Sequence, residues 1–123
     1  MFIVGTKARI SDNSGAKTAQ CIKVLGGKKV GKVGDSIIVS IKTVRNHSRS
    51  SKVKEGSLHQ AIIIRTKKEF RRKDGTSISF DENSITLFKK GGQPLCTRLF
   101  GPVLYDLRKV RDFKILSLSS IIL

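Results

Sequence analysis

Aromatic residues are scarce in this chain. It has no tryptophan, one tyrosine and six phenylalanines. Phe80, Phe88 and Phe100 lie apart in the sequence and are expected in the core. Proteins that bind single-stranded nucleic acid by stacking need clustered aromatic side chains on the strands of a sheet. The composition therefore argues against a stacking platform of that kind.

Cysteine and long apolar runs are also scarce. Cys21 and Cys96 are the only cysteines, neither belongs to a Cys-x-x-Cys unit, and His47 and His59 complete no zinc-binding spacing. We expect two reduced thiols packed as small hydrophobic groups, and no metal or cofactor. The apolar runs are too short to span a bilayer, and no helix pattern opposes a basic face to an apolar one, so no membrane partner is predicted.

Acidic residues are the third shortage. Nine Asp and Glu stand against 25 Lys and Arg, which gives a formal net charge of +16 in 123 residues. A charge so far from zero repels itself in the compact state, so a polyanionic partner is expected. Nucleic acid is the favoured candidate, because a phosphate backbone rewards many dispersed cations through counterion release. Folded RNA, recognised by its backbone and shape, fits both the charge and the few aromatics.

The sequence offers no catalytic constellation, and we predict that the protein is not an enzyme. Asp81 and Glu82 are adjacent, so on a strand they would point to opposite faces. The segment Gly26-x-x-x-x-Gly31-Lys32 nearly matches a phosphate-binding P-loop. However, Val33 stands where Ser or Thr would hold magnesium, and the β-branched run after Gly34 precludes the required helix.

Short alternating patterns with glycine turns fill most of the chain and predict a mainly β fold, a small barrel in a single domain over residues 1–123. A tight hairpin is expected at Asp74-Gly75 and would project with its cations. Helical spacing appears only from Pro102 to Lys109, where a short helix is predicted, and Phe113 to Leu118 fits a strand or a helix. The expected strands are Lys7–Ser11, Lys17–Leu25, Ser36–Val44, Leu58–Thr66, Phe70–Lys73, Thr76–Phe80 and Ser84–Phe88.

Basic segments separate these strands. They are a glycine-rich loop from Lys28 to Gly34, a loop from Arg45 to Lys54 with interspersed serines, and the hairpin from Arg65 to Lys73. Cations mixed with hydroxyl groups suit phosphate contacts, and so basic a hairpin would repel itself without an anion. The predicted RNA-binding residues are Asn13, Ser14, Lys17, Lys23, Lys28, Lys29, Lys32, Arg45, Arg49, Lys52, Lys54, Arg65, Lys67, Lys68, Arg71, Arg72 and Lys73.

Ten segments follow one another in a distinctive order along the chain. They are Asp12-Asn13-Ser14-Gly15-Ala16, Cys21-Ile22-Lys23-Val24-Leu25-Gly26-Gly27, Val33-Gly34-Asp35, Ile64-Arg65-Thr66-Lys67-Lys68, Asp74-Gly75, Phe80-Asp81-Glu82-Asn83, Thr97-Arg98, Phe100-Gly101-Pro102-Val103, Lys114-Ile115 and Ser117-Leu118. Their order resembles the family of large-subunit ribosomal protein fourteen. The resemblance runs from about Arg9 to the end; it departs at Thr86, where the family prefers valine, and is poor over Arg45 to Lys54 and at Leu95-Cys96.

The resemblance implies a five-stranded β-barrel with a projecting β-ribbon and small C-terminal helices. It implies a structural constituent of the large ribosomal subunit that binds large-subunit rRNA at the subunit interface and contributes to an intersubunit bridge. The implied further partners are small-subunit rRNA, neighbouring large-subunit proteins and a ribosome silencing factor, the last at Thr97, Arg98 and Lys114. The alternative is a free-standing module of the same barrel that binds single-stranded nucleic acid.

The chain also departs from the family in composition. Ile, Lys, Ser and Phe are heavily used, and residues 119–123 replace the usual Ala-Pro-Glu-Val-Leu ending. This difference in composition indicates that the protein is an organellar member of the family, and we expect it in the mitochondrial matrix. Met1 to Lys7 shows neither a signal peptide nor a transit peptide, so we expect the protein to be encoded within the organelle. A bacterial cytoplasmic or plastid protein is the alternative.

Overall fold

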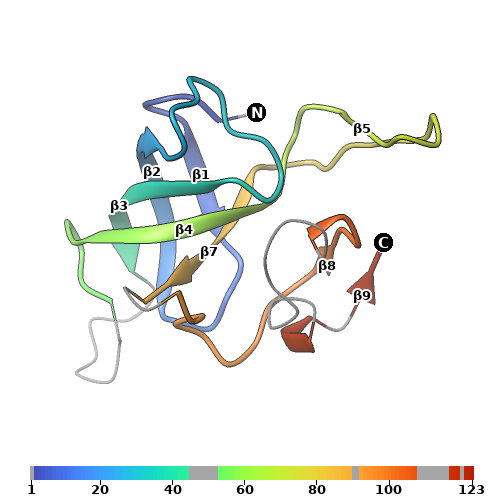
Figure 1. Cartoon of the computed structure of the whole chain (residues 1–123). Coiled ribbons are helices and arrows are strands. Elements are labelled where there is room, and N and C mark those ends of the chain that lie inside the picture. The colour runs from blue at the N-terminus through green and yellow to red at the C-terminus, as the bar shows by residue number, and fades with distance from the viewer. Residues whose placement is uncertain (1, 45–52, 90–91, 108–116, 120) are drawn as a thin grey trace.

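The strands close into a barrel. The computed structural model describes residues 2–44, 53–89, 92–107, 117–119 and 121–123. In order around the barrel the strands are β1 (Lys7–Ile10), β2 (Ala16–Val24), β3 (Ser36–Val44), β4 (Leu58–Arg65) and β7 (Ser84–Phe88) (Figure 1). β1 and β7 pair in parallel, and the other neighbours are antiparallel. The predicted mainly β barrel is confirmed, with strand bounds that differ from the prediction by one residue or less.

Alternation along the strands fills the barrel interior. On β3, Ile37, Val39 and Ile41 are almost fully buried, and they pack with inward residues of the other barrel strands. Phe2 is fully buried at one end, where its backbone exchanges two hydrogen bonds with Gly31. A Cβ on Gly31 would lie 2.9 Å from the Ile63 side chain, so this close approach requires glycine.

A second apolar cluster lies outside the barrel wall. Ile62, Ile64 and Phe88 on β4 and β7 face away from the interior, and a segment of the last quarter of the chain covers them. This segment contributes buried Cys96, Leu99, Val103, Leu104 and Leu107. Because β4 is covered on both faces, its sequence is apolar on both faces, as predicted for a central strand.

The predicted hairpin is a ribbon that projects from the barrel (Figure 1). Its strands, β5 (Phe70–Arg71) and β6 (Ser77–Ile78), are shorter than expected. Gly75 has a φ of 92°, and the Asp74 carboxylate accepts hydrogen bonds from the Thr76 backbone and hydroxyl. The Thr76 hydroxyl and backbone hydrogen bonds lower the pKa of Asp74. The Asp74-Gly75 turn is therefore confirmed.

The C-terminal region departs from prediction. Pro102 and Val103 form β8, which pairs in parallel with β9 (Ile121–Ile122), and Leu104 to Asp106 are not helical. The helix predicted from Pro102 to Lys109 is therefore wrong over its first five residues, and its last two lie outside the described residues. Among the described residues, Leu107 and Ser117–Leu118 are helical, and no helix there is long and apolar enough to cross a membrane. Phe100, expected in the core, is 40% exposed.

Candidate nucleic-acid interface

The glycine loop, residues 26–34, is held at its base and presents cations at its surface. Gly34 donates a backbone hydrogen bond to Ile63, and the Asp35 carboxylate accepts one from the Lys32 backbone. Lys28, Lys29 and Lys32 are exposed, and Lys28 pairs with Asp35 at 3.1 Å. The residues after the loop form β3, so the loop lacks the helix that a P-loop needs.

The β-ribbon presents a second group of cations. Lys67, Lys68, Arg71 and Lys73 are exposed. Arg72 differs, because its side chain is only 23% exposed and its Nε donates to Asp106 at 2.8 Å. Arg72 also donates to the backbone oxygen of Leu123. Its guanidinium thus joins the ribbon to the C-terminal segment.

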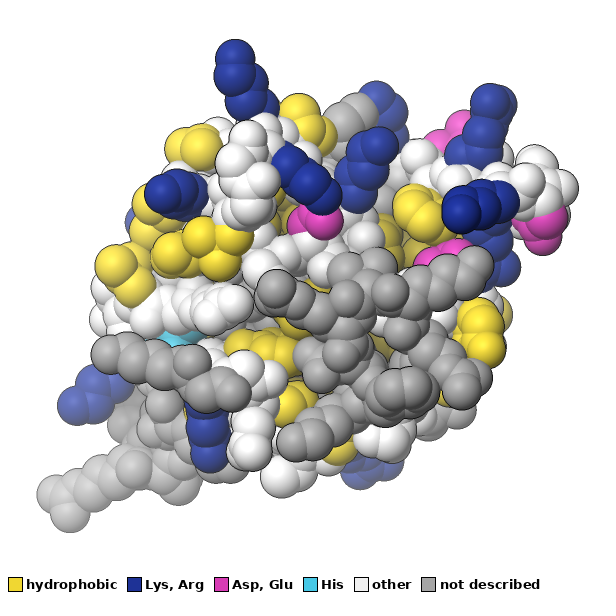
Figure 2. Space-filling view, viewed as in Figure 1, with side chains coloured by type: hydrophobic (Ala, Val, Ile, Leu, Met, Phe, Trp, Pro, Cys, Tyr) yellow, Lys and Arg dark blue, Asp and Glu magenta, His cyan; other side chains and the backbone are white. Residues whose placement is uncertain are grey.

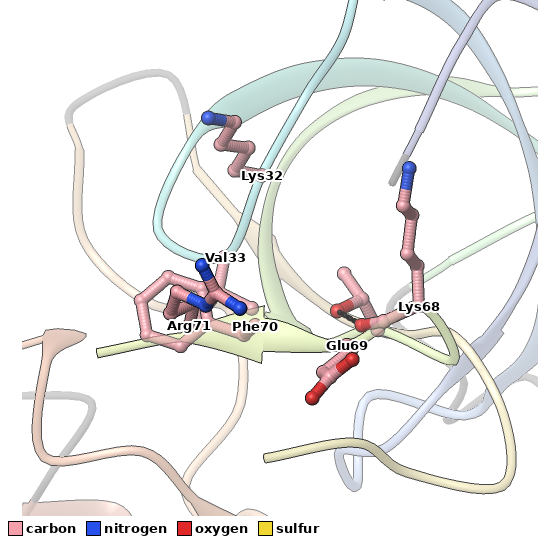
Figure 3. Close-up of a pocket in the computed structure, with 7 residues that line it drawn as sticks. Lys32, Val33, Lys68, Glu69, Phe70 and Arg71 are labelled. Atoms are coloured by element: carbon pink, nitrogen blue, oxygen red, sulfur yellow. Dashed lines mark hydrogen bonds between the residues drawn. The ribbon is translucent and has the colours of Figure 1, made fainter. Parts of the chain in front are cut away.

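A cleft of about 300 Å³ lies between the glycine loop and the ribbon. It is lined by Lys32 and Val33 from the loop, and by Thr66 and residues 68–71 from the end of β4 and the ribbon. Figure 3 shows the Lys32 and Lys68 ammonium groups directed to the same side, and the Glu69 carboxylate to the opposite side. The fold therefore brings together two basic segments that lie far apart in the sequence.

The space-filling view shows the resulting surface. Lys and Arg side chains gather over the glycine-loop end of the barrel and over the ribbon (Figure 2). A net charge of +16 leaves few carboxylates to compensate them. A surface of dispersed, exposed cations suits an extended phosphate backbone better than a small anion.

Arg65 does not belong to this surface. Arg65 is 8% exposed, and its guanidinium donates to the backbone oxygens of Phe100 and Pro102 at 3.0 and 2.9 Å. It also donates to the Ser11 and Ser84 hydroxyls. Burial lowers the pKa of Arg65, and the Glu82 carboxylate partly offsets this. A guanidinium so engaged has no free face for a phosphate group, so its prediction as an RNA ligand is not retained.

Ser14 is also an internal residue. It is 2% exposed, and its backbone and hydroxyl both donate to the Asp12 carboxylate. The same carboxylate accepts from the Leu87 backbone and from the Thr86 hydroxyl at 3.1 Å. Thr86 in turn lies 3.7 Å from the Cys96 sulfur. Two positions that depart from the family pattern, Thr86 and Cys96, are therefore in contact.

Asn13 joins the predicted RNA-binding group to the predicted protein-binding group. Its amide nitrogen donates to the Thr97 hydroxyl at 2.7 Å, and its amide oxygen accepts from the Thr97 and Arg98 backbone. Thr97 and Arg98 are both exposed. Asn13 therefore acts as a structural link that fixes the backbone at Thr97 and Arg98, and leaves the Arg98 guanidinium on the surface.

The remaining predicted residues fall into two groups. Lys17, Lys23 and Lys54 are described and exposed, away from the ribbon in the sequence. Arg45, Arg49, Lys52 and Lys114 lie outside the described residues.

Sequence reasoning also missed a residue. Phe70 was assigned to a strand without a role, yet it lines the cleft. No local pattern signals this, because the cleft depends on the approach of the glycine loop to the ribbon.

A comparison with known protein families agrees with the fold and the basic surface. The family model described as ribosomal protein L14p/L23e matches residues 1–123. Members of this family are structural rather than catalytic constituents of the large ribosomal subunit, where they bind rRNA and other ribosomal proteins. The match favours a ribosomal role over a free-standing nucleic-acid-binding module. Its full-length extent, on a five-stranded barrel with a projecting basic ribbon, shows that this chain belongs to the L14p/L23e family of ribosomal proteins.

Proposed function

We propose that this ribosomal protein binds large-subunit rRNA through one face, formed by the glycine loop and the ribbon, and that this face anchors it at the subunit interface. The observation that carries the proposal is the convergence of Lys32 with Lys68 and Arg71 around one cleft. Dispersed surface lysines and arginines contact phosphate groups and fix the position of a protein on RNA. They contribute little to folding.

Cross-linking tests the location of the face. Photo-cross-linking groups placed at Lys29 and Arg71 should attach to large-subunit rRNA in assembled subunits, and sequencing of the cross-linked RNA should find neighbouring sites. A photo-cross-linking group at Lys42 serves as the control, because Lys42 lies near the end of β3 that is farther from the glycine loop. Attachment from Lys42 but not from Lys29 and Arg71 would place the RNA on another face.

We further propose that Arg98 serves a protein partner or the small subunit, not large-subunit rRNA. Arg98 is exposed, its backbone is fixed by Asn13, and it lies apart from the glycine loop in the sequence. A planar guanidinium suits a carboxylate on a partner as well as it suits a phosphate. The proposed partners are a ribosome silencing factor and small-subunit rRNA at an intersubunit bridge, with Thr97 and Lys114 in the same group.

The Arg98 proposal has a simple genetic test. Arg98→Ala should leave incorporation into the large subunit near normal and weaken subunit joining or binding of a silencing factor. Lys114→Glu should behave in the same way. Failed incorporation with normal joining would assign both residues to the large-subunit rRNA face instead.

We also propose that the ribosome concerned is mitochondrial, on the strength of the heavy use of Ile, Lys, Ser and Phe. Co-sedimentation of the protein with large subunits from purified mitochondria tests this. Recovery only with bacterial or plastid ribosomes would contradict it.

A further inference from the structure

The cleft between the glycine loop and the ribbon has two chemically different sides. Lys32 and Lys68 direct their ammonium groups to one side, and Glu69 directs its carboxylate to the other (Figure 3). Val33 and Phe70 contribute apolar surface to the lining. A nucleotide has the same polarity, with an anionic phosphate at one end, a flat apolar face and hydrogen-bonding groups on the base edge.

The volume of the cleft also suits one nucleotide. About 300 Å³ is the lower end of the range for small-ligand sites, and it is too small for an RNA duplex. Exposed phosphates of a duplex would need only the cations on the rim, not the half-buried Phe70 ring. A base that leaves its helix can place a face on an aromatic ring.

Glu69 is the feature that a surface for phosphate alone does not explain. Three carboxylates pair with cations in the fold, Asp35 with Lys28, Asp106 with Arg72 and Glu82 with Arg9. Glu69, like the exposed Glu55 and Asp81, has no such partner among the described residues, but it is the one that lines the cleft. Within the described part of the chain, Glu69 makes no hydrogen bond or ion pair, and it is exposed. A carboxylate repels phosphate, but it accepts hydrogen bonds from amino and imino groups of a base.

We propose that this cleft binds one unpaired nucleotide of the RNA, with its phosphate toward Lys32 and Lys68, its base against Phe70 and its donor edge toward Glu69. The proposal rests on the proposed RNA-binding function and adds a specific subsite to it. Guanine offers both an N–H and an amino group on one edge, whereas uracil presents two carbonyl oxygens beside a single N–H. The cleft should therefore prefer guanine and disfavour uracil.

Binding of the full-length chain to RNA hairpins tests the proposal. The hairpins carry one bulged nucleotide, either guanosine, uridine or an abasic residue, or no bulge. The abasic bulge has the flexibility of the others but no base to bind. Stacking on one aromatic ring supports a preference of about tenfold for the guanosine bulge over the abasic bulge. The uridine bulge should bind between the two, because uracil stacks on the ring but presents carbonyl oxygens to the Glu69 carboxylate.

Two variants locate the effect in the cleft. Glu69→Gln adds an amide donor, so it should raise affinity for the uridine bulge to near that for the guanosine bulge. Glu69 is exposed, so this variant should fold normally. Phe70→Leu keeps an apolar side chain but loses the aromatic face, and should reduce the preference for the guanosine bulge over the abasic bulge. Lys42→Ala, distant from the cleft, should keep the guanosine preference.

The outcomes separate the cleft from the wider face. Equal binding of all four hairpins by the unmodified protein would overturn the nucleotide site and leave the proposed RNA-binding function intact. A guanosine preference unaffected by both Glu69→Gln and Phe70→Leu would also overturn it, because the preference would arise elsewhere. Failure to bind any hairpin or large-subunit rRNA would overturn both.

Discussion

At the scale of single residues, the basic side chains divide into those that hold the fold and those that face solvent. Arg65 is buried with four hydrogen bonds, and a Cβ on Gly101 would lie 2.5 Å from its Nη1, so the chain closes tightly around it. Arg71, six residues later, is exposed. The sequence places both in one basic run, and only the three-dimensional contacts separate them.

Replacement of Arg65 should therefore affect stability. Arg65→Met leaves two backbone oxygens and two hydroxyl groups without their charged donor, which should lower the free energy of unfolding by about 3 kcal/mol. Arg65→Lys should recover little of this, because an ammonium group cannot reproduce the planar fork. Urea unfolding measures both, with Arg71→Ala as the control, expected within about 0.5 kcal/mol of the unmodified protein. Equal stability of Arg65→Met and Arg71→Ala would contradict the assignment.

A half-buried histidine, His59, should make stability depend on pH. Burial lowers the pKa of His59 below its ordinary 6.5, so the unfolded chain takes up its proton at a higher pH than the folded chain. The contribution of His59 to stability is thus present above pH 6.5 and is lost as the pH falls through the lowered value. We expect the free energy of unfolding to fall more between pH 7 and pH 5 for the unmodified protein than for His59→Gln. Parallel pH profiles would show that His59 contributes nothing.

At the scale of elements, the ribbon is tied to the C-terminal segment. Arg72 on the ribbon pairs with Asp106, and both side chains are about a quarter exposed. The contact of the Arg72 guanidinium with the Leu123 backbone adds a second tie. Since a two-stranded ribbon is marginal alone, these ties should help to fix its direction.

A double-mutant cycle measures this tie. Arg72→Ala and Asp106→Ala should each destabilise the protein, and their combined effect should fall short of the sum by about 1 kcal/mol. The salt dependence of the coupling should be modest because the pair is partly buried. Additive effects would mean that the pair does not hold the ribbon.

The same scale shows which elements the sequence could predict. β3 and β7 have the predicted bounds, because alternation and turn residues are local signals. The helix predicted from Pro102 is absent at that residue because Pro102 pairs with Ile121 in a parallel strand pair. The spacing of residues along the chain does not reveal this contact. Likewise, Ser14 lies in a polar turn sequence, but its burial depends on Asp12 and its link to β7. The exposure of the ribbon lysines could be predicted from the sequence. The cleft that Lys68 lines together with Lys32 could not, because it depends on the approach of two segments that lie far apart in the sequence.

At the scale of the whole molecule, the distribution of charge matters more than its sum. A protein of net charge +16 will bind RNA through many cations under low salt, so affinity alone says little about a face. If binding is localised, cations on the glycine loop and ribbon should release counterions on binding and cations elsewhere should not. Lys42 and Lys89 are exposed cations outside the glycine loop and ribbon, and provide a comparison of equal charge.

The most direct measurement is the slope of log affinity against log salt for a duplex fragment of large-subunit rRNA. The double variant Lys32→Ala with Arg71→Ala should reduce the magnitude of the slope by about two units, near one for each lost phosphate contact. The matched variant Lys42→Ala with Lys89→Ala should leave it close to that of the unmodified protein. Equal reductions in the two variants, or a larger one for Lys42 and Lys89, would contradict a binding face formed by the glycine loop and the ribbon.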